Sequence, residues 1–393
     1  MDRSDETAPV EEAEPLLIRR SAFALAALAL STIFLITIPV AAWVYATQRP
    51  PVDFVSFWAA GRLAASGHPA LAYDLELHRA LERTVTTIGP GFMPFPYPPP
   101  FLLAVVPVAI RPFWLAYLLW IGVTSGLFLA ATWRLLPPRF AFAHPAAIVN
   151  AIIGQNGFLT SSIFVFGIST VAAQPLLGGA ILGLLVVKPQ LAILIPVALL
   201  ASRNWRAIAA GIASALILLA LAAAVFGIDS YRAFLAALHE QAALVANYEW
   251  DWSEQVSVFA FFRWFGVDRA IALGLQGIVA LGAAAITWRA WAADLEQRAA
   301  ILAAATILVP PYLFTYDSLI LILPLAVFLR DPARPWRPVI LWVSLFLPFL
   351  GYLEIHPGPN TIPIGAILSL WWLLRDSADK KKAAAPFDAA ANA

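Results

Sequence analysis

A single carboxylate stands where the chain leaves its first long apolar run. The run covers residues 21–46, and Pro50-Pro-Val-Asp53 follows it. Proline cannot continue the helical hydrogen-bond ladder, so the first helix ends here and a second one can begin at Asp53. Asp53 could cap that helix by accepting backbone N–H bonds. It could equally take a proton from a hydroxyl group that attacks a lipid-linked phosphate ester at headgroup level.

Further polar residues, spread along the chain, are candidates for binding a polar substrate. They are Arg62, Tyr97, Gln155, Asn156, Lys188, Tyr316 and Asp317. Several have an ordinary alternative, as interface anchors, as groups that satisfy the backbone at a helix break, or as a lysine that reaches to the headgroups. Asp317 differs because a carboxylate beside an apolar run is costly unless it is paired or hydrated, which favours a function.

A second group of polar residues lies in predicted external loops. Glu249-Trp-Asp251-Trp could bind an acceptor sugar, although anchoring of the tryptophans in the interface explains the cluster more simply. Glu354 and His356 lie at another membrane edge on the same predicted side, and His356 is expected to be a loop residue.

Composition places all these residues in a membrane protein. The 393 residues are 61% hydrophobic and 12% charged, with a mean hydropathy of +0.79. Such a chain cannot be packed as a water-soluble globule. The net charge of +1 provides no field that would attract nucleic acid. The absence of cysteine excludes disulfides, thiolate catalysis and thiolate metal sites.

The apolar runs predict an all-α integral membrane bundle. They lie at residues 21–46, 98–110, 113–133, 158–173, 175–187, 189–201, 207–227, 270–290, 299–313, 317–329, 338–353 and 361–374. Several are shorter than the roughly 20 residues that a perpendicular helix needs, so we expect about twelve spans, in a range of roughly 10 to 13. Residues 21–375 then form one transmembrane domain between a disordered cytoplasmic tail, 1–20, and a basic, then alanine-rich cytoplasmic tail, 376–393.

The basic residues predict that both termini are cytoplasmic. In the twelve-span arrangement one side carries Arg19-Arg20, Arg111, Arg203, Arg206, Arg289, Arg298, Arg330, Arg334, Arg337, Arg375 and Lys380-Lys-Lys382. Residues 47–97 then form a long first external loop bearing interfacial helices, and residues 134–157 form another external loop. One alternative stays open. Residues 175–201 are either two short spans meeting at Lys188 or one long helix kinked at Pro189, which would reverse the local orientation.

Five pieces of the sequence, in this order, resemble a known family. They are Asp53-Phe-Val-Ser-Phe-Trp-Ala-Ala-Gly-Arg62 with Gly67-His-Pro and Ala72-Tyr-Asp74, Phe95-Pro-Tyr-Pro-Pro-Pro-Phe101, Gly154-Gln-Asn156, Lys188-Pro-Gln190 and Pro310-Pro-Tyr-Leu-Phe-Thr-Tyr-Asp317. Together they resemble the polyprenol-phosphate-mannose-dependent mannosyltransferases of glycosyltransferase family 87. No single piece is diagnostic; their order across residues 53–317 carries the resemblance.

The resemblance implies a GT-C fold in the cell (inner) membrane, an active site that faces away from the cytoplasm, and a polyprenyl-phosphate sugar as donor. It implies an inverting transfer with Asp53 as the catalytic base. The leaving phosphate then needs a cation or hydrogen-bond donors, which Lys188 or Arg62 could supply. No pair of neighbouring carboxylates follows the first span, so neither an essential metal nor a cofactor is predicted. The family often has a histidine where this chain has Tyr316-Asp317, which leaves the sugar and the acceptor open.

Two alternatives stand beside the expected transfer of a hexose, mannose, to a lipid or glycan acceptor. A secondary transporter would use Lys188 and Asp317 as coupling or substrate residues, but it predicts two related halves with matched broken helices that we do not find. Another GT-C enzyme would share the fold and Asp53 but transfer arabinose or aminoarabinose. The sequence does not encode the acceptor, the linkage or the oligomeric state.

Overall fold

The protein is a bundle of helices. The computed structural model describes residues 10–48, 52–86, 94–247, 252–294, 296–353 and 358–391. Over these residues the one β pairing is an isolated bridge between Gln255 and Phe314. The predicted all-α class is therefore confirmed. It follows from the apolar sequence, because a chain surrounded by lipid must satisfy its backbone polar groups internally and a helix does so within one segment.

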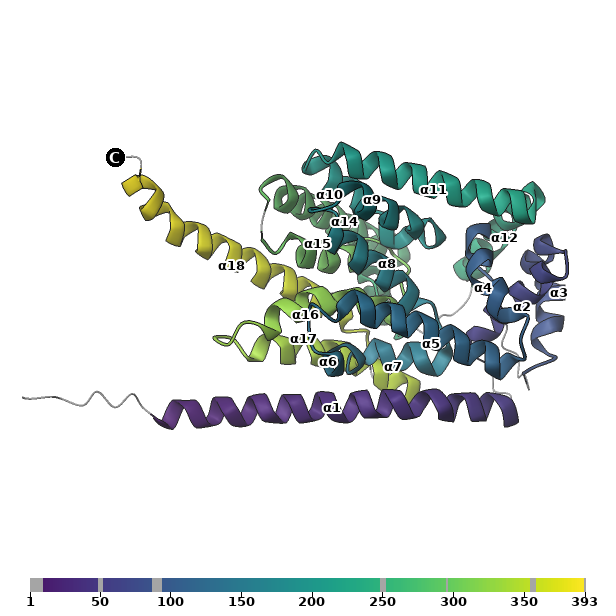
Figure 1. Cartoon of the computed structure of the whole chain (residues 1–393), viewed down its shortest axis with the longest axis horizontal. Helices are drawn as coiled ribbons and strands as arrows, with labels where there is room; N and C mark the ends of the chain where they lie inside the picture. The colour runs from purple at the N-terminus through teal and green to yellow at the C-terminus, as the bar shows by residue number, and fades with distance from the viewer. Residues whose placement is uncertain are drawn as a thin grey trace, which may run out of the picture.

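The helices differ widely in length. The α-helices, most of them labelled in Figure 1, are α1 (Val10–Thr47), α2 (Phe54–Ala65), α3 (Leu75–Glu82), α4 (Leu102–Ala109), α5 (Phe113–Thr132), α6 (Pro138–Phe142), α7 (Pro145–Ile153), α8 (Gly157–Thr170), α9 (Pro175–Gly183), α10 (Leu194–Ala201), α11 (Trp205–Phe226), α12 (Ile228–Asn247), α13 (Val258–Trp264), α14 (Arg269–Ala292), α15 (Arg298–Ile307), α16 (Ile322–Leu329), α17 (Trp336–Phe346) and α18 (Ile362–Ala391). The 3-10 helices are η1 (Pro69–Tyr73), η2 (Pro99–Phe101), η3 (Leu184–Val187), η4 (Pro189–Ala192), η5 (Thr315–Leu321) and η6 (Leu347–Leu353). Within the described residues, four stretches are long and apolar enough to cross a membrane, namely Phe23–Thr47, Phe113–Thr132, Trp205–Phe226 and Arg269–Ala292. The other apolar helices are shorter or broken.

The bundle has two distinct ends (Figure 1). Helices α2 and α3 gather at one end, on the right in Figure 1, and we call it the α2 end. Helix α1 begins and helix α18 finishes at the opposite end, which we call the terminal end. Helix α1 lies along one side of the bundle for most of its length. Helix α2 is packed against protein, with nine of its residues buried from Phe54 to Ala64, and its place at the membrane interface stays a prediction.

Residues 98–110 do not cross the bundle, contrary to the prediction. The indole N–H of Trp58, in α2, donates a 3.0 Å hydrogen bond to the carbonyl of Arg111. Phe101, at the other end of this segment, has its ring 5.1 Å from that of Phe57, also in α2. Both ends of α4 therefore lie beside α2, and Leu102, Val105 and Ala109 of α4 are buried against protein.

Residues 134–157 are not an external loop either. Arg330, from the opposite part of the sequence, donates a 2.8 Å hydrogen bond to the carbonyl of Leu135, so these two residues lie together. From there α6 and α7 follow α1: the rings of Phe34 and Phe142 stack at 4.5 Å, and the Tyr45 hydroxyl donates to the carbonyl of Ile152. Helix α7 thus returns the chain toward the α2 end.

The chain folds back on itself at Lys188. Lys188 has non-helical backbone angles (φ −145°, ψ 74°) between η3 and η4. Asn204, after α10, donates a 3.4 Å hydrogen bond to the carbonyl of Val171, before α9. The start of α9 and the end of α10 are therefore close together, and Lys188 lies at the turn between the two helices. Residues 175–201 are thus two short segments and not one kinked helix. The total of about twelve spans stays a prediction.

A second fold-back is formed by α15 and by η5 with α16. Gln297, before α15, and Phe328, in α16, line the same cavity, so the start of α15 and the end of α16 also lie together. Residues 308–317 lie at the turn where the chain reverses between these segments. Non-helical backbone inside a membrane protein is tolerated where it is buried in protein or lines a cavity, so these turns are places where a site can form.

Helices extend into both predicted tails. Helix α1 begins at Val10, within the stretch 1–20 that was expected to be disordered, and residues 1–9 lie outside the described part. Helix α18 continues to Ala391, through most of the predicted tail 376–393.

Candidate active site

Asp53 stands at the N-terminus of α2, but its side chain does not cap that helix. Its backbone is helical (φ −58°, ψ −31°), and its carboxylate makes no capping hydrogen bond. The capping role is therefore wrong. Instead, Oδ2 of Asp53 accepts a 2.8 Å hydrogen bond from Nε2 of Gln155, which lies 102 positions further along the chain.

The Asp53 carboxyl group is partly buried, and its surroundings shift its pKa in opposite directions. Burial raises its pKa above the ordinary value, while the hydrogen bond from Gln155 and the positive charge of Lys188 lower it. Burial is the largest of these effects. A carboxylate with a raised pKa is a better proton acceptor, as general-base chemistry requires.

The turn between α7 and α8 supplies the amide side chains of the site. Gly154 ends α7 with φ +73°, a left-handed conformation that glycine adopts without strain. A Cβ at Gly154 would lie 2.4 Å from the Cβ of Phe54, so glycine also allows the close approach to α2. Oε1 of Gln155 accepts hydrogen bonds from the Tyr97 hydroxyl (3.3 Å) and from the Asn156 backbone N–H (3.1 Å).

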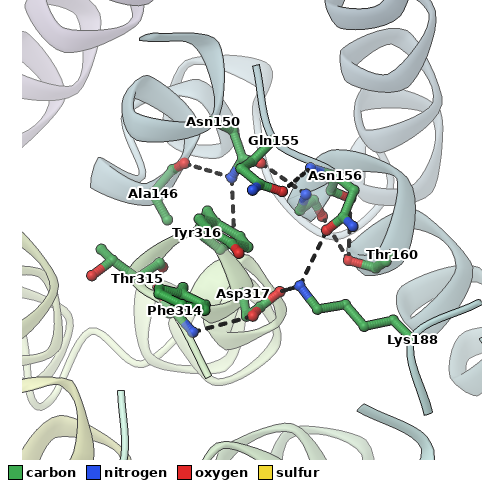
Figure 2. Close-up of polar contacts among 12 residues, drawn as sticks. Ala146, Asn150, Gln155, Asn156, Thr160, Lys188, Phe314, Thr315, Tyr316 and Asp317 are labelled. Carbon is green, nitrogen blue, oxygen red and sulfur yellow. Dashed lines mark hydrogen bonds and ion pairs between the residues drawn. The ribbon is translucent and has the colours of Figure 1, made fainter. Parts of the chain in front are cut away.

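Lys188 connects this turn to η5. Its ammonium donates to Oδ1 of Asp317 at 2.5 Å and to Oδ1 of Asn156 at 3.1 Å (Figure 2). Lys188 is 6% exposed and Asp317 is fully buried, so the two charges compensate each other inside the protein. The alternative of a lysine that reaches to the headgroups is wrong for Lys188. Asp317 is paired, which meets one of the two conditions under which a carboxylate is tolerated beside an apolar run.

Aromatic rings border the charged pair. The rings of Phe314 and Tyr316 stack at 5.4 Å with 9° between their planes. Nζ of Lys188 lies 4.7 Å from the centroid of the Tyr316 ring and 5.9 Å from that of Tyr97. Such contacts hold an ammonium without consuming its N–H donors.

Asn150 is a residue of the site that sequence reasoning missed. Its Nδ2 donates to the carbonyls of Ala146 (2.8 Å) and Tyr316 (3.2 Å), and its Oδ1 accepts from the N–H of Gly157 (2.8 Å) (Figure 2). A Cβ on Gly157 would lie within 2.6 Å of both Asn150 side-chain polar atoms and of the Tyr316 carbonyl oxygen. The available signal was a lone amide in the apolar stretch of α7, four residues before Gly154.

Arg62 is not part of this network. It lies near the far end of α2, nine residues after Asp53 and so about 13 Å along the helix. Its side chain is exposed, and its guanidinium lies 5.6 Å from the centroid of the Trp58 ring. The structure thus brings together Asp53, Tyr97, Gln155, Asn156, Lys188, Tyr316 and Asp317, but not Arg62.

The second group of polar residues is mostly outside the described part of the chain. This holds for Glu249, Asp251, Glu354 and His356. Trp252 is described, and its ring packs 5.6 Å from that of Phe259.

The arrangement can accept a proton at one place and hold an anion at another. Asp53 offers a carboxylate and Lys188 offers an ammonium. A chain of three hydrogen bonds, through Gln155 and Asn156, connects the two groups. Within the described residues, no cluster of three or more histidine, aspartate or glutamate side chains could hold a metal ion.

Comparison with known proteins identifies the family. The sequence model of glycosyltransferase family 87 matches residues 95–315, more than half of the 393 residues. The matched region contains Tyr97, Gln155, Asn156 and Lys188; Asp53 precedes it, and Tyr316 and Asp317 follow directly after it. No curated protein and no solved structure matches the chain. The chain therefore belongs to glycosyltransferase family 87 and is a membrane glycosyltransferase.

Proposed function

We propose that this enzyme transfers a mannosyl group from a polyprenyl-phosphate donor to a hydroxyl group of a lipid or glycan acceptor, with inversion at the anomeric carbon. One observation carries the proposal. Segments far apart in the sequence meet around a carboxylate that caps no helix, and they join it through amides to a buried lysine.

The proposed reaction is a single displacement. The acceptor oxygen attacks the anomeric carbon while its proton passes to the carboxylate of Asp53. The bond from the anomeric carbon to the phosphate oxygen breaks, and polyprenyl phosphate leaves with the electron pair. Because the acceptor attacks opposite the leaving group, the anomeric configuration inverts.

Lys188 is better placed than Arg62 to stabilise the leaving phosphate. An ammonium group has three N–H donors. The donor contacts described for Lys188 are those to Asp317 and Asn156, so one N–H remains for a phosphate oxygen. A preorganised charge in a water-poor site stabilises a developing anion strongly.

The site is proposed to face away from the cytoplasm. Asp53 stands at the start of α2 and so belongs to the α2 end, whereas Arg19-Arg20 lie in the first third of α1, which begins at the terminal end. Basic residues favour the cytoplasmic side, which supports a cytoplasmic terminal end.

The test uses purified enzyme in nanodiscs with a panel of lipid-phosphate sugars, including mannose, arabinose and aminoarabinose donors, and with lipid acceptors. We expect label to move from the mannose donor, with an anomeric configuration opposite to that of the donor, in the presence of a chelator. Transfer from another sugar would correct the donor, and loss of transfer on chelation would overturn the metal-independent mechanism. No transfer from any lipid-phosphate sugar would refute the proposed donor class.

A further inference from the structure

We propose that Gln155 is a positioning residue for Asp53 and not a ligand of the sugar, the role suggested by its residue type. The inference rests on the proposed function in one respect, since it takes Asp53 as the base. In every other respect it is argued from the contacts of Gln155 itself.

The orientation of the Gln155 amide is determined by chemistry. A backbone N–H can only donate, and that of Asn156 points at one atom of the Gln155 amide at 3.1 Å. That atom must be the oxygen, Oε1, which also accepts from the Tyr97 hydroxyl. The other atom, Nε2, is therefore the one that faces Asp53 and donates to it at 2.8 Å. Gln155 is buried, and its described contacts already occupy Oε1 twice and Nε2 once, so its amide is engaged within the protein.

The carboxylate of Asp53 depends on this contact. Among the described residues, the Gln155 amide is the hydrogen-bond partner that the structure gives to the Asp53 side chain. The bond occupies Oδ2, which leaves Oδ1 to take the proton of an acceptor. A base held by one oxygen keeps the other in a fixed direction, and such orientation contributes directly to the rate.

The backbone around Gln155 is built for the same purpose. The N–H of Gln155 donates to the carbonyl of Asn150 at 3.2 Å, and Gly154 lies against Phe54, the residue next to Asp53. Asp53 and Gln155 are thus held opposite each other by two adjoining contacts. A glutamine that only contacted a sugar would not need its backbone to be held opposite Asp53.

The charges around Asp53 set the sign of the pH effect. Lys188 is the cation that acts on Asp53, it is paired with Asp317, and the phenols of Tyr45 and Tyr97 act on the carboxylate as neutral groups at neutral pH. The donation from Gln155 stabilises the ionised form and so lowers the pKa of Asp53. Removal of that donation raises the pKa. A base must be ionised, so activity is then lost at a higher pH as the solution is acidified.

The experiment compares Gln155→Met with the wild type and with Gln174→Met, a control glutamine that is exposed and makes no capping hydrogen bond. In Gln155→Met we expect kcat to fall by about 10 to 100-fold, the KM for the donor to stay within about two-fold, and the acid limb of kcat/KM to move to higher pH. A rise in donor KM with an unmoved acid limb would identify a sugar ligand and overturn the proposal.

A second readout does not depend on activity. A water-soluble carbodiimide labels protonated carboxyl groups, and mass spectrometry of Asp53 as a function of pH gives the midpoint of its protonation. We expect Gln155→Met to move this midpoint upward and Gln174→Met to leave it unchanged. An unchanged midpoint in Gln155→Met would overturn the proposal. If the Met variant does not fold, Gln155→Leu, which also lacks a donor and adds no charge, is measured instead with the same expectation.

The two readouts separate the two proposals. A wild type that transfers none of the lipid-phosphate sugars refutes the proposed function, while the labelling midpoint still decides whether Gln155 acts on Asp53.

Discussion

Two buried charge clusters in this protein are built differently. In one, the guanidinium of Arg337 donates to both carboxylate oxygens of Asp376, at 2.5 and 3.1 Å. Aromatic rings of Phe328, Trp336 and Trp372 surround it at 5.7 to 6.0 Å. In the other, Lys188 donates to Asp317 and Asn156.

The difference distinguishes a structural contact from a reactive one. Arg337 and Asp376 form a planar, bidentate pair that links α17 to α18, and both carboxylate oxygens of Asp376 are occupied by it. The ammonium of Lys188 is a compact charge with a donor to spare, and Asp53, joined to it through amides, keeps one carboxylate oxygen for a substrate. A carboxylate with one oxygen left for a substrate is therefore the property that sets the α2-end network apart.

The largest effect is expected at the base. Asp53→Asn keeps the shape of the side chain and can still accept from Gln155, but it cannot take a proton. We expect the rate of transfer to fall by about 10³-fold or more. The rate is measured with labelled donor, and the unfolding temperature must match the wild type. A variant that retains a tenth of the activity would show that another group is the base.

The next effect concerns the Lys188–Asp317 pair. Lys188→Met leaves a buried carboxylate without its partner and should lower the stability by about 3–5 kcal/mol. Adding Asp317→Asn should restore most of that stability, yet the rate of transfer should stay about 100-fold low because the ammonium is absent. Unfolding and transfer are measured for both single variants and the double variant. A double variant as active as the wild type would remove Lys188 from the mechanism.

The Arg337 cluster should respond in the opposite way. Arg337→Met should cost about 2–4 kcal/mol of stability, since Asp376 keeps its 3.1 Å contact with Arg334 but loses the bidentate one. The kcat/KM of the folded fraction should stay within about two-fold, because distant sites without shared contacts are independent. A loss of kcat/KM in fully folded protein would mean that the two clusters are coupled.

The smallest effect is expected at Arg62. Arg62→Gln removes an exposed side chain that stacks on Trp58, outside the network. The KM for the donor should change by less than about two-fold, since an exposed contact of this kind is weak. A ten-fold or larger rise in that KM would show that Arg62 binds the phosphate of the donor.

Much of the site could be predicted from the sequence, because its residues mark the places where apolar runs break. A break in a membrane helix exposes backbone polar groups, so polar residues collect there whatever their function. The same logic suggested a helix cap at Asp53, since a carboxylate after two prolines has the pattern of a cap. Only the structure reveals that its side chain caps no helix and accepts instead from Gln155, 102 positions away.

The fold was harder to predict where apolar residues face protein instead of lipid. Residues 98–110 are as apolar as a membrane span but pack against α2, and residues 145–153 were hidden among helix breaks although they run along α1. Hydropathy does not distinguish these environments. Asn150 was missed for a related reason, because nothing local connects it to Tyr316, 166 positions later.

The most direct test of the account is a cryo-electron microscopy structure of Asp53→Asn in nanodiscs with polyprenyl-phosphate mannose bound. The account predicts the anomeric carbon beside the carboxamide at position 53 and a phosphate oxygen on the ammonium of Lys188. A sugar bound away from position 53, with the phosphate on Arg62 or on no side chain of this network, would contradict it.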